Sequence, residues 1–140
     1  PLVGSFIAAL ILLFGLILKS RVISRVGLIV FICSALLTIP AEETGEEAEH
    51  QLEKAEGLNY SHDLIHEHEE LAERFSLIAR ITGIIALGAY FFSFGAGKIG
   101  LTLRVITLIG ALITAYYGAQ TAHEGGKISH PFLRDEAAKH

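Results

Sequence analysis

Five of the seven histidines fall in two short stretches of the chain, where they could act together as ligands. They are His62, His66, His68, His123 and His130. Neutral imidazole is a usual nitrogen ligand for haem iron, zinc and copper. The two stretches are about sixty residues apart in the sequence. This chemistry therefore requires a fold that brings both stretches to one end of the molecule.

The elements that must position these histidines are four apolar segments, at about residues 2–18, 22–39, 75–97 and 100–122. Hydrophobic residues make up 51% of the sequence, and the mean hydropathy is +0.50, which exceeds the needs of an ordinary soluble core. Segments of this length and composition predict transmembrane helices. Because hydrocarbon does not tolerate unpaired backbone groups, we predict one all-α domain over 1–140, an integral membrane four-helix up-down bundle.

The charges predict how this bundle is oriented. The two short links between spans and their flanks carry only basic residues, namely Lys19, Arg21, Arg25, Lys98 and Arg104. All fifteen acidic residues lie in 40–74 or after residue 121. The positive-inside rule then places the links in the cytoplasm, and both termini, the segment 40–74 and the tail 123–140 on the outer side. The net charge of -4, without a basic patch, excludes nucleic-acid binding.

The outer segment is expected to be an acidic loop over 41–60, because Pro40 should end the second span, followed by a juxtamembrane helix that starts at Ser61. We expect this helix to continue unbroken into the third span. At about 100° per residue, His68 lies on the face of the small residues Ala72 and Ala79. This makes His68 the best ligand candidate on the helix.

The other polar residues of this helix have two interpretations each. His62 and His66 share a different face with Glu69 and Glu73, either as a hydrated surface pair or as a divalent-metal site with Glu69 or Glu70. Arg80 lies one or two turns into the span. We expect it to snorkel outward, to pair with Glu73 or Glu69, or to hold an acidic cofactor group such as a propionate.

After the fourth span, Gly125 and Gly126 are predicted to end the helix in a left-handed cap. The chain can then fold back, so that His130 reaches the mouth of the bundle. His123 and His130 are either ligands or exposed polar residues. No serine, cysteine or paired-carboxylate constellation supports catalysis, so we predict a protein that is not itself an enzyme.

Small residues predict which helix surfaces face other helices. One stripe on the third span comprises Ala72, Ala79, Thr82, Gly83, Ala86 and Ser93. A second stripe on the fourth span comprises Ala111, Ala115, Gly118 and Ala122. The single cysteine, Cys33, stands in an apolar run and is expected to be a small packing residue.

Four motifs together carry a family resemblance. They read Pro1-Leu-Val-Gly, Pro40-Ala-Glu-Glu-Thr-Gly45-Glu-Glu-Ala-Glu, His66-Glu67-His68-Glu69-Glu70-Leu-Ala72, and His123-Glu-Gly125-Gly126-Lys-Ile-Ser-His130-Pro131. Over nearly the whole chain the sequence resembles a family of small bacterial four-helix membrane proteins predicted to bind b-type haem. That family carries an Asn-His pair ahead of the first span, so we expect the natural chain to begin upstream of Pro1 with a further histidine. Ser129 stands where the family often has arginine, and His62 and His66 are outside its pattern.

The resemblance implies a b-type cytochrome or cytochrome-like subunit in the bacterial inner membrane. Two of His68, His123, His130 and the upstream histidine would hold one haem b near the outer face, with Glu69, Arg80, Gly125 and Gly126 around it. Its partners would be lipid and other membrane or periplasmic redox subunits. Two alternatives are a cofactor-free docking subunit of a respiratory or photosynthetic complex, and an outer-face divalent-metal protein using His62, His66, Glu69 and His123.

Overall fold

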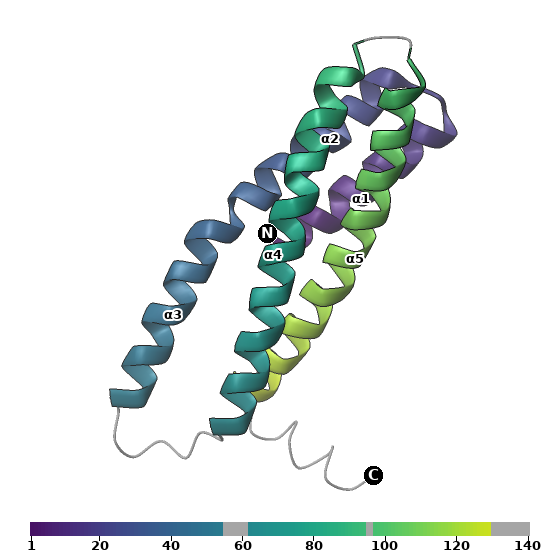
Figure 1. The fold of residues 1–140 in the computed structure, drawn as a ribbon. Coiled ribbons are helices and arrows are strands. Elements are labelled where there is room, and N and C mark those ends of the chain that lie inside the picture. The colour runs from purple at the N-terminus through teal and green to yellow at the C-terminus, as the bar shows by residue number, and fades with distance from the viewer. Residues whose placement is uncertain (55–61, 95–96, 130–140) are drawn as a thin grey trace, which may run out of the picture.

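The computed structural model describes residues 1–54, 62–94 and 97–129, which form helices and turns without any strand (Figure 1). The helices are α1 (Leu2–Ile17), α2 (Arg21–Leu36), α3 (Thr38–Lys54), α4 (His62–Phe92) and α5 (Lys98–Ser129). The prediction of an all-α protein is confirmed. The expected unbroken helix through the third span is also confirmed, since α4 has no interruption from His62 to Phe92.

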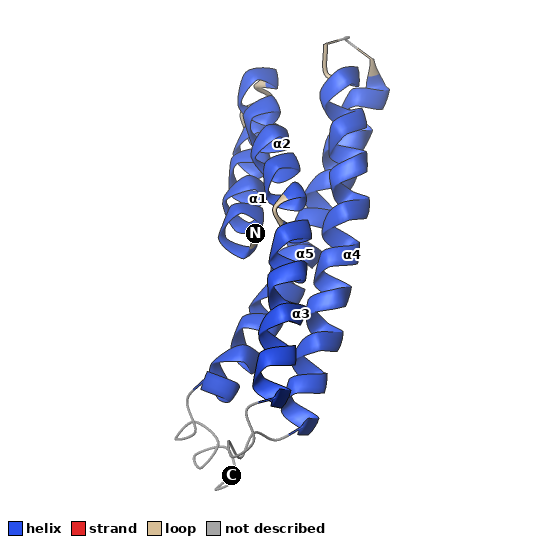
Figure 2. Cartoon of the chain, turned by 90° about the vertical axis from the view of Figure 1, so that its left-hand side faces the viewer, coloured by secondary structure: helices blue, strands red, loops and turns tan. Residues whose placement is uncertain are grey.

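The helices form two hairpins that pack against each other. Helix α1 lies along α2, and α4 lies along α5; α2 contacts α4 and α1 contacts α5 (Figures 1 and 2). Three helical stretches are long and apolar enough to cross a membrane, namely Arg21–Gly45, His68–Phe92 and Lys98–His123. Helix α1 is a shorter apolar helix of 16 residues. These properties are those of a membrane protein with transmembrane helices.

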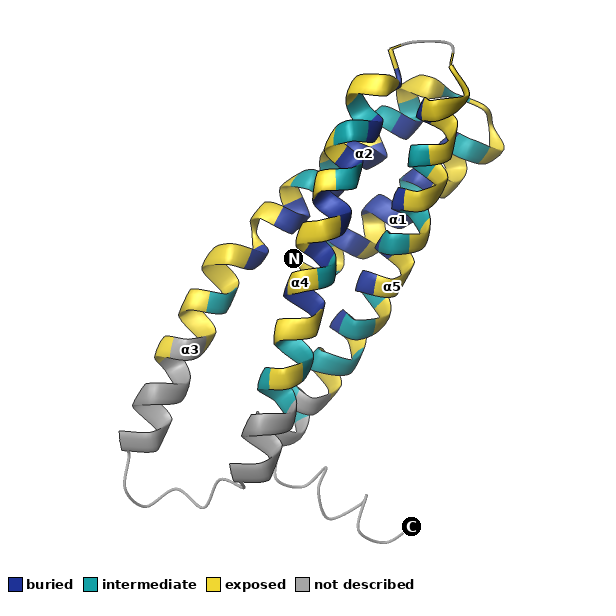
Figure 3. Cartoon of the chain, viewed as in Figure 1, coloured by how far each residue is buried: buried dark blue, intermediate teal, exposed yellow. Residues whose placement is uncertain are grey.

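The distribution of side-chain size between core and surface also suits a lipid environment. Large apolar residues are strongly exposed, for example Ile84 at 73% and Phe91 at 64%. Exposed residues alternate with buried and intermediate ones along the helices (Figure 3). The core instead holds alanines, a few larger apolar residues such as Phe31, and many hydroxyl side chains. Helices in lipid associate through close packing of small residues rather than through burial of large apolar ones, which explains this arrangement.

The predicted small-residue stripe on the third span is confirmed, because all of its members except the half-buried Ala72 are buried. On α5 the prediction was partly wrong. Ala122 is exposed, whereas Thr107 and Thr114 are fully buried. Each of these threonines donates its hydroxyl to the carbonyl four residues earlier, at 2.8 Å, which removes the cost of burying it. The predicted stripe on α5 contained only alanines and glycine, so the prediction overlooked these buried threonines.

Helices α1 and α2 come very close together at two glycines. A Cβ atom on Gly15 would lie 2.5 Å from the backbone nitrogen of Ser24, and one on Gly27 would lie 2.8 Å from that of Leu12. Side chains larger than hydrogen cannot fit there without moving the helices. Cys33, in contrast, is exposed on α2, so its predicted packing role was wrong.

The link between α1 and α2 is short because both helix ends are capped within three residues. Lys19 adopts a left-handed conformation with φ of 51°, and the amide of Ser20 donates to the carbonyl of Gly15 at 2.9 Å. This is the Schellman pattern, in which glycine usually takes the left-handed position. Ser20 then caps α2, accepting a hydrogen bond from the amide of Ile23 at 3.3 Å.

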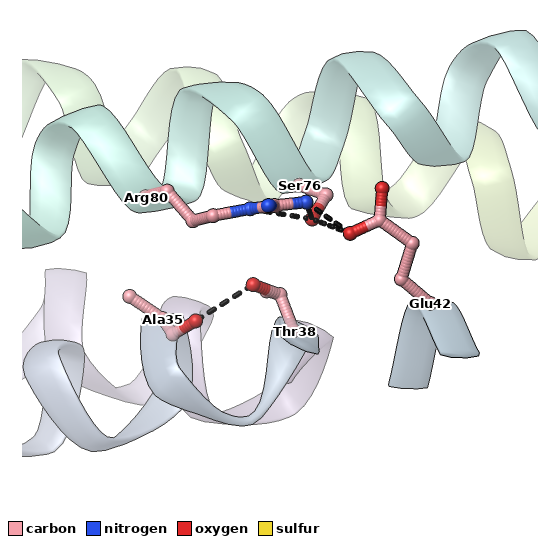
Figure 4. Close-up of polar contacts among 5 residues, drawn as sticks. All are labelled: Ala35, Thr38, Glu42, Ser76 and Arg80. Carbon is pink, nitrogen blue, oxygen red and sulfur yellow. Dashed lines mark hydrogen bonds and ion pairs between the residues drawn. The ribbon is translucent and has the colours of Figure 1, made fainter. Parts of the chain in front are cut away.

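The acidic segment is helical rather than the loop that we predicted. Helix α2 ends at Leu36, and α3 begins at Thr38 after a single turn residue. The Thr38 hydroxyl donates to the Ala35 carbonyl at 2.7 Å across this break (Figure 4). Pro40 lies in the first turn of α3, where its missing amide hydrogen costs no hydrogen bond. Pro40 is therefore accommodated within α3, which begins two residues before it at Thr38. Residues 55–61, with the predicted helix start at Ser61, lie outside the described part of the chain.

The predicted helix end at Gly125 and Gly126 was also wrong, because α5 continues through both glycines to Ser129. Glycine lowers helix propensity by about 1 kcal/mol relative to alanine, so tertiary contacts must favour the helix at this point. Such a contact exists at Gly125, which packs against the imidazole of His68. His130 lies outside the described residues.

Candidate functional site

His68 on α4 is held in place by a backbone group of α5. Its Nδ1 atom lies 3.0 Å from the carbonyl oxygen of Thr121. A carbonyl can only accept a hydrogen bond, so Nδ1 carries the proton in a neutral ring and Nε2 carries the lone pair. The side chain is half-buried. This arrangement orients His68 as a ligand that would bind through Nε2.

Gly125 completes the surroundings of His68. It lies one helical turn after Thr121 on the same face of α5. A Cβ atom on Gly125 would approach Cε1 of His68 to 3.1 Å and Nδ1 to 3.4 Å. A Cβ atom on Gly126 would meet nothing within 4 Å. Of the two predicted glycines, therefore, only Gly125 shapes the space around the imidazole.

The structure does not bring His123 to the same place as His68. His123 is exposed, and it lies about 200° around α5 from Thr121, which is two residues earlier. His62 and His66 belong to α4, but their side chains, like His130, lie outside what the structure describes. For these three histidines the sequence-based predictions remain predictions.

Acidic and sulfur ligands do not gather around His68 within the described residues. Glu69, the next residue, is half-buried. Among the residues whose side chains the structure describes, which leave out His62 and His66, no three His, Cys, Asp or Glu side chains converge in a way that could hold a metal ion.

Arg80 pairs with an acid that we did not predict. Its guanidinium forms an ion pair with Glu42 of α3, and Ser76 bridges the two (Figure 4). The Ser76 hydroxyl donates to Glu42 at 3.0 Å and accepts from Arg80 Nη2 at 2.7 Å. The predicted partners Glu73 and Glu69 were therefore wrong for this ion pair. The reason is that 41–54 is a helix, which places Glu42 beside α4.

A signal for this network was present in the sequence. Ser76 and Arg80 are four residues apart and share one face of a helix, and Glu42 follows Thr38 by the same spacing. The Thr121 carbonyl, in contrast, has no sequence signal, since a backbone acceptor can belong to any residue type.

Comparison with protein-family models, with characterised proteins and with solved structures gave no significant match.

Proposed function

We propose that the protein is a membrane-embedded, b-type cytochrome-like electron-transfer protein, built as a four-helix up-down bundle that binds one haem b near its outer face. The observation that carries this proposal is the contact between His68 Nδ1 and the Thr121 carbonyl. It is supported by the half-buried position of His68 and by Gly125, which lets α5 lie against the ring.

The residues of the chain would serve the cofactor in separate ways. The Nδ1 hydrogen bond fixes the rotation of the imidazole and increases the basicity of Nε2, which is the usual role of such a carbonyl beside a ligating histidine. Haem supplies one-electron redox chemistry when bound, and the protein sets its potential through ligand identity and burial. His68 would provide one axial ligand, and His130, His123 or an upstream histidine the second.

Charged residues would define the neighbourhood of the haem and its partners. The acidic end of the bundle would face outward under the positive-inside rule, toward a quinol or a periplasmic redox subunit. Arg80 already forms an ion pair with Glu42, so a haem propionate would have to share this guanidinium. This makes Arg80 a weaker candidate for holding a propionate than the sequence alone suggested.

The experiment that tests the proposal is a reduced-minus-oxidised absorption spectrum of the protein purified after haem-replete expression. We expect a b-type spectrum that is lost in His68→Ala, with helix content unchanged by circular dichroism. His123→Ala tests whether His123 supplies the second ligand: because its side chain is exposed and lies on another face of α5 from Thr121, we expect this variant to keep the spectrum. Protein without a Soret band, or a band unchanged in His68→Ala, would contradict the proposal.

A second candidate function, a cofactor-free docking subunit of a larger membrane complex, is favoured by the surface of α3. Glu43 and Glu47 on this helix are exposed. They offer negative charge to a basic partner. Glu43→Gln with Glu47→Gln would abolish co-purification of such a partner while leaving the Glu42 ion pair intact. A stable colourless protein with this behaviour would favour docking over electron transfer.

A further inference from the structure

The hairpin tips, the end of the molecule where α1 meets α2 and α4 meets α5, carry positive charge without any acid (Figure 1). Five basic residues lie in or next to these tips, namely Lys19, Arg21, Arg25, Lys98 and Arg104. Residues 1–41 and 75–123 contain no Asp or Glu. The nearest acid along the chain from Arg25 is Glu42, on the order of 25 Å away at about 1.5 Å per helical residue.

Arg25 is fixed in position by the end of α4. Its Nε donates to the hydroxyl of Ser93 at 3.1 Å, and its Nη2 donates to the carbonyl of the same residue at 2.9 Å. The guanidinium also stacks 4.0 Å above the ring of Phe94. Ser93 is buried at 1% exposure, so the anchor is part of the packed interior. These contacts orient Arg25 but do not neutralise it.

Arg104 is fixed in a similar way between α5 and α2. Its Nε donates to the Gly100 carbonyl at 2.9 Å, and its Nη1 lies 3.4 Å from the hydroxyl of the fully buried Ser24. Ser24 donates its own proton to the Ser20 carbonyl at 2.9 Å, so it accepts from Arg104. Arg21 and Arg25 both lie near enough to repel Arg104 electrostatically.

These contacts leave both guanidinium groups able to bind an anion. A guanidinium has five N–H donors, and the contacts above engage two nitrogens of each arginine. Like charges held near one another are unfavourable unless a counter-ion joins them. Guanidinium groups bind phosphate through paired hydrogen bonds, and basic pockets between membrane helices bind anionic headgroups.

We propose that Arg25 and Arg104, assisted by Arg21, form a binding site for the phosphate of an anionic phospholipid that bridges α2 and α5. The ligand is a lipid rather than free phosphate because exposed apolar side chains continue from the arginines along both helices. On the side of the arginines away from the tips, Val26 is 46% exposed on α2, and Val105 and Ile109 are 41% and 54% exposed on α5. They offer a surface for the acyl chains below the headgroup.

Native mass spectrometry of the full chain tests the site, with detergent-solubilised protein given equal amounts of phosphatidylglycerol and phosphatidylcholine. We expect the unaltered protein to retain phosphatidylglycerol preferentially, about tenfold or more for two charge-assisted contacts. The Arg25→Gln, Arg104→Gln double variant should lose this preference. Arg74→Gln is the matched control, because Arg74 has the same charge but is exposed and pairs with Glu70 at the other end of α4.

Two further measurements make the result decisive. The first is thermal unfolding followed by circular dichroism, with either phosphatidylglycerol or inorganic phosphate added at the same concentration. This comparison distinguishes a lipid headgroup from free phosphate as the ligand. We expect only the lipid to raise the melting temperature. Arg104→Lys keeps the charge but loses the planar fork, so it should retain part of the preference. Equal retention of both lipids by the unaltered protein, an equal effect of inorganic phosphate, or an unchanged preference in a folded double variant would overturn the proposal.

Discussion

Gly125 lies against the imidazole of His68, so close that a Cβ atom there would be 3.1 Å from Cε1. If His68 ligates haem, Gly125→Ala should displace the ring and weaken haem binding. Substitutions that disturb the orientation of a ligating histidine typically cost about 10–100-fold in affinity. Haem titration of the apoprotein, followed at the Soret band, measures this loss.

Gly126→Ala is the control for that measurement, because a Cβ atom at Gly126 meets nothing within 4 Å. Both substitutions change helix propensity in the same direction, by up to about 1 kcal/mol. Their difference therefore reports the contact with His68. Equal haem affinity in the two variants would show that Gly125 does not position the ligand.

The ion pair between Glu42 and Arg80 should hold the start of α3 against α4. Glu42→Gln removes the charge but keeps the shape, and Glu43→Gln is the control because Glu43 is exposed. Both partners are partly exposed, so we expect a coupling of only about 0.5–1 kcal/mol. A double-mutant cycle of Glu42→Gln with Arg80→Gln, measured by denaturant unfolding, gives this value. Additive effects of the two changes would contradict it.

The close approach of α1 and α2 should make Gly27 sensitive to substitution. In Gly27→Ala the added Cβ would lie 2.8 Å from the backbone nitrogen of Leu12, so the hairpin must open. We expect a loss of about 1–3 kcal/mol, the usual cost of overpacking. In Gly88→Ala nothing lies within 4 Å of the new methyl group, so this variant should be as stable as the unaltered protein or more so. Thermal unfolding of both variants checks the contrast.

Lys19 should be replaceable by glycine with a gain in stability. Its φ of 51° is unfavourable for a residue with a Cβ atom, at a cost of about 1 kcal/mol. Lys19→Gly should recover this energy, whereas Lys19→Ala removes the same charge but keeps the unfavourable conformation. A melting temperature that rises in the alanine variant as much as in the glycine variant would attribute the effect to charge.

Several features of the fold could be predicted because they depend on local composition. The apolar stretches predicted the helices, three of which are long and apolar enough to cross a membrane, and the period of small residues predicted the face of α4 that is buried. Prediction failed where the outcome depended on neighbours in space. Pro40 and Gly125 both read as helix ends, yet α3 begins around the first and α5 passes through the second.

The sequence by itself determined the helical membrane class and the separation of basic and acidic ends, because both follow from the identity and order of side chains. By helical phase it also predicted that His68 lies on the face of Ala72 and Ala79, and the half-buried position of His68 agrees with this. Only the tertiary structure decided which groups meet His68 and Arg80. The Thr121 carbonyl and Glu42 reach them from other helices. Such contacts depend on the register of one helix against another, which no local pattern in this chain specifies.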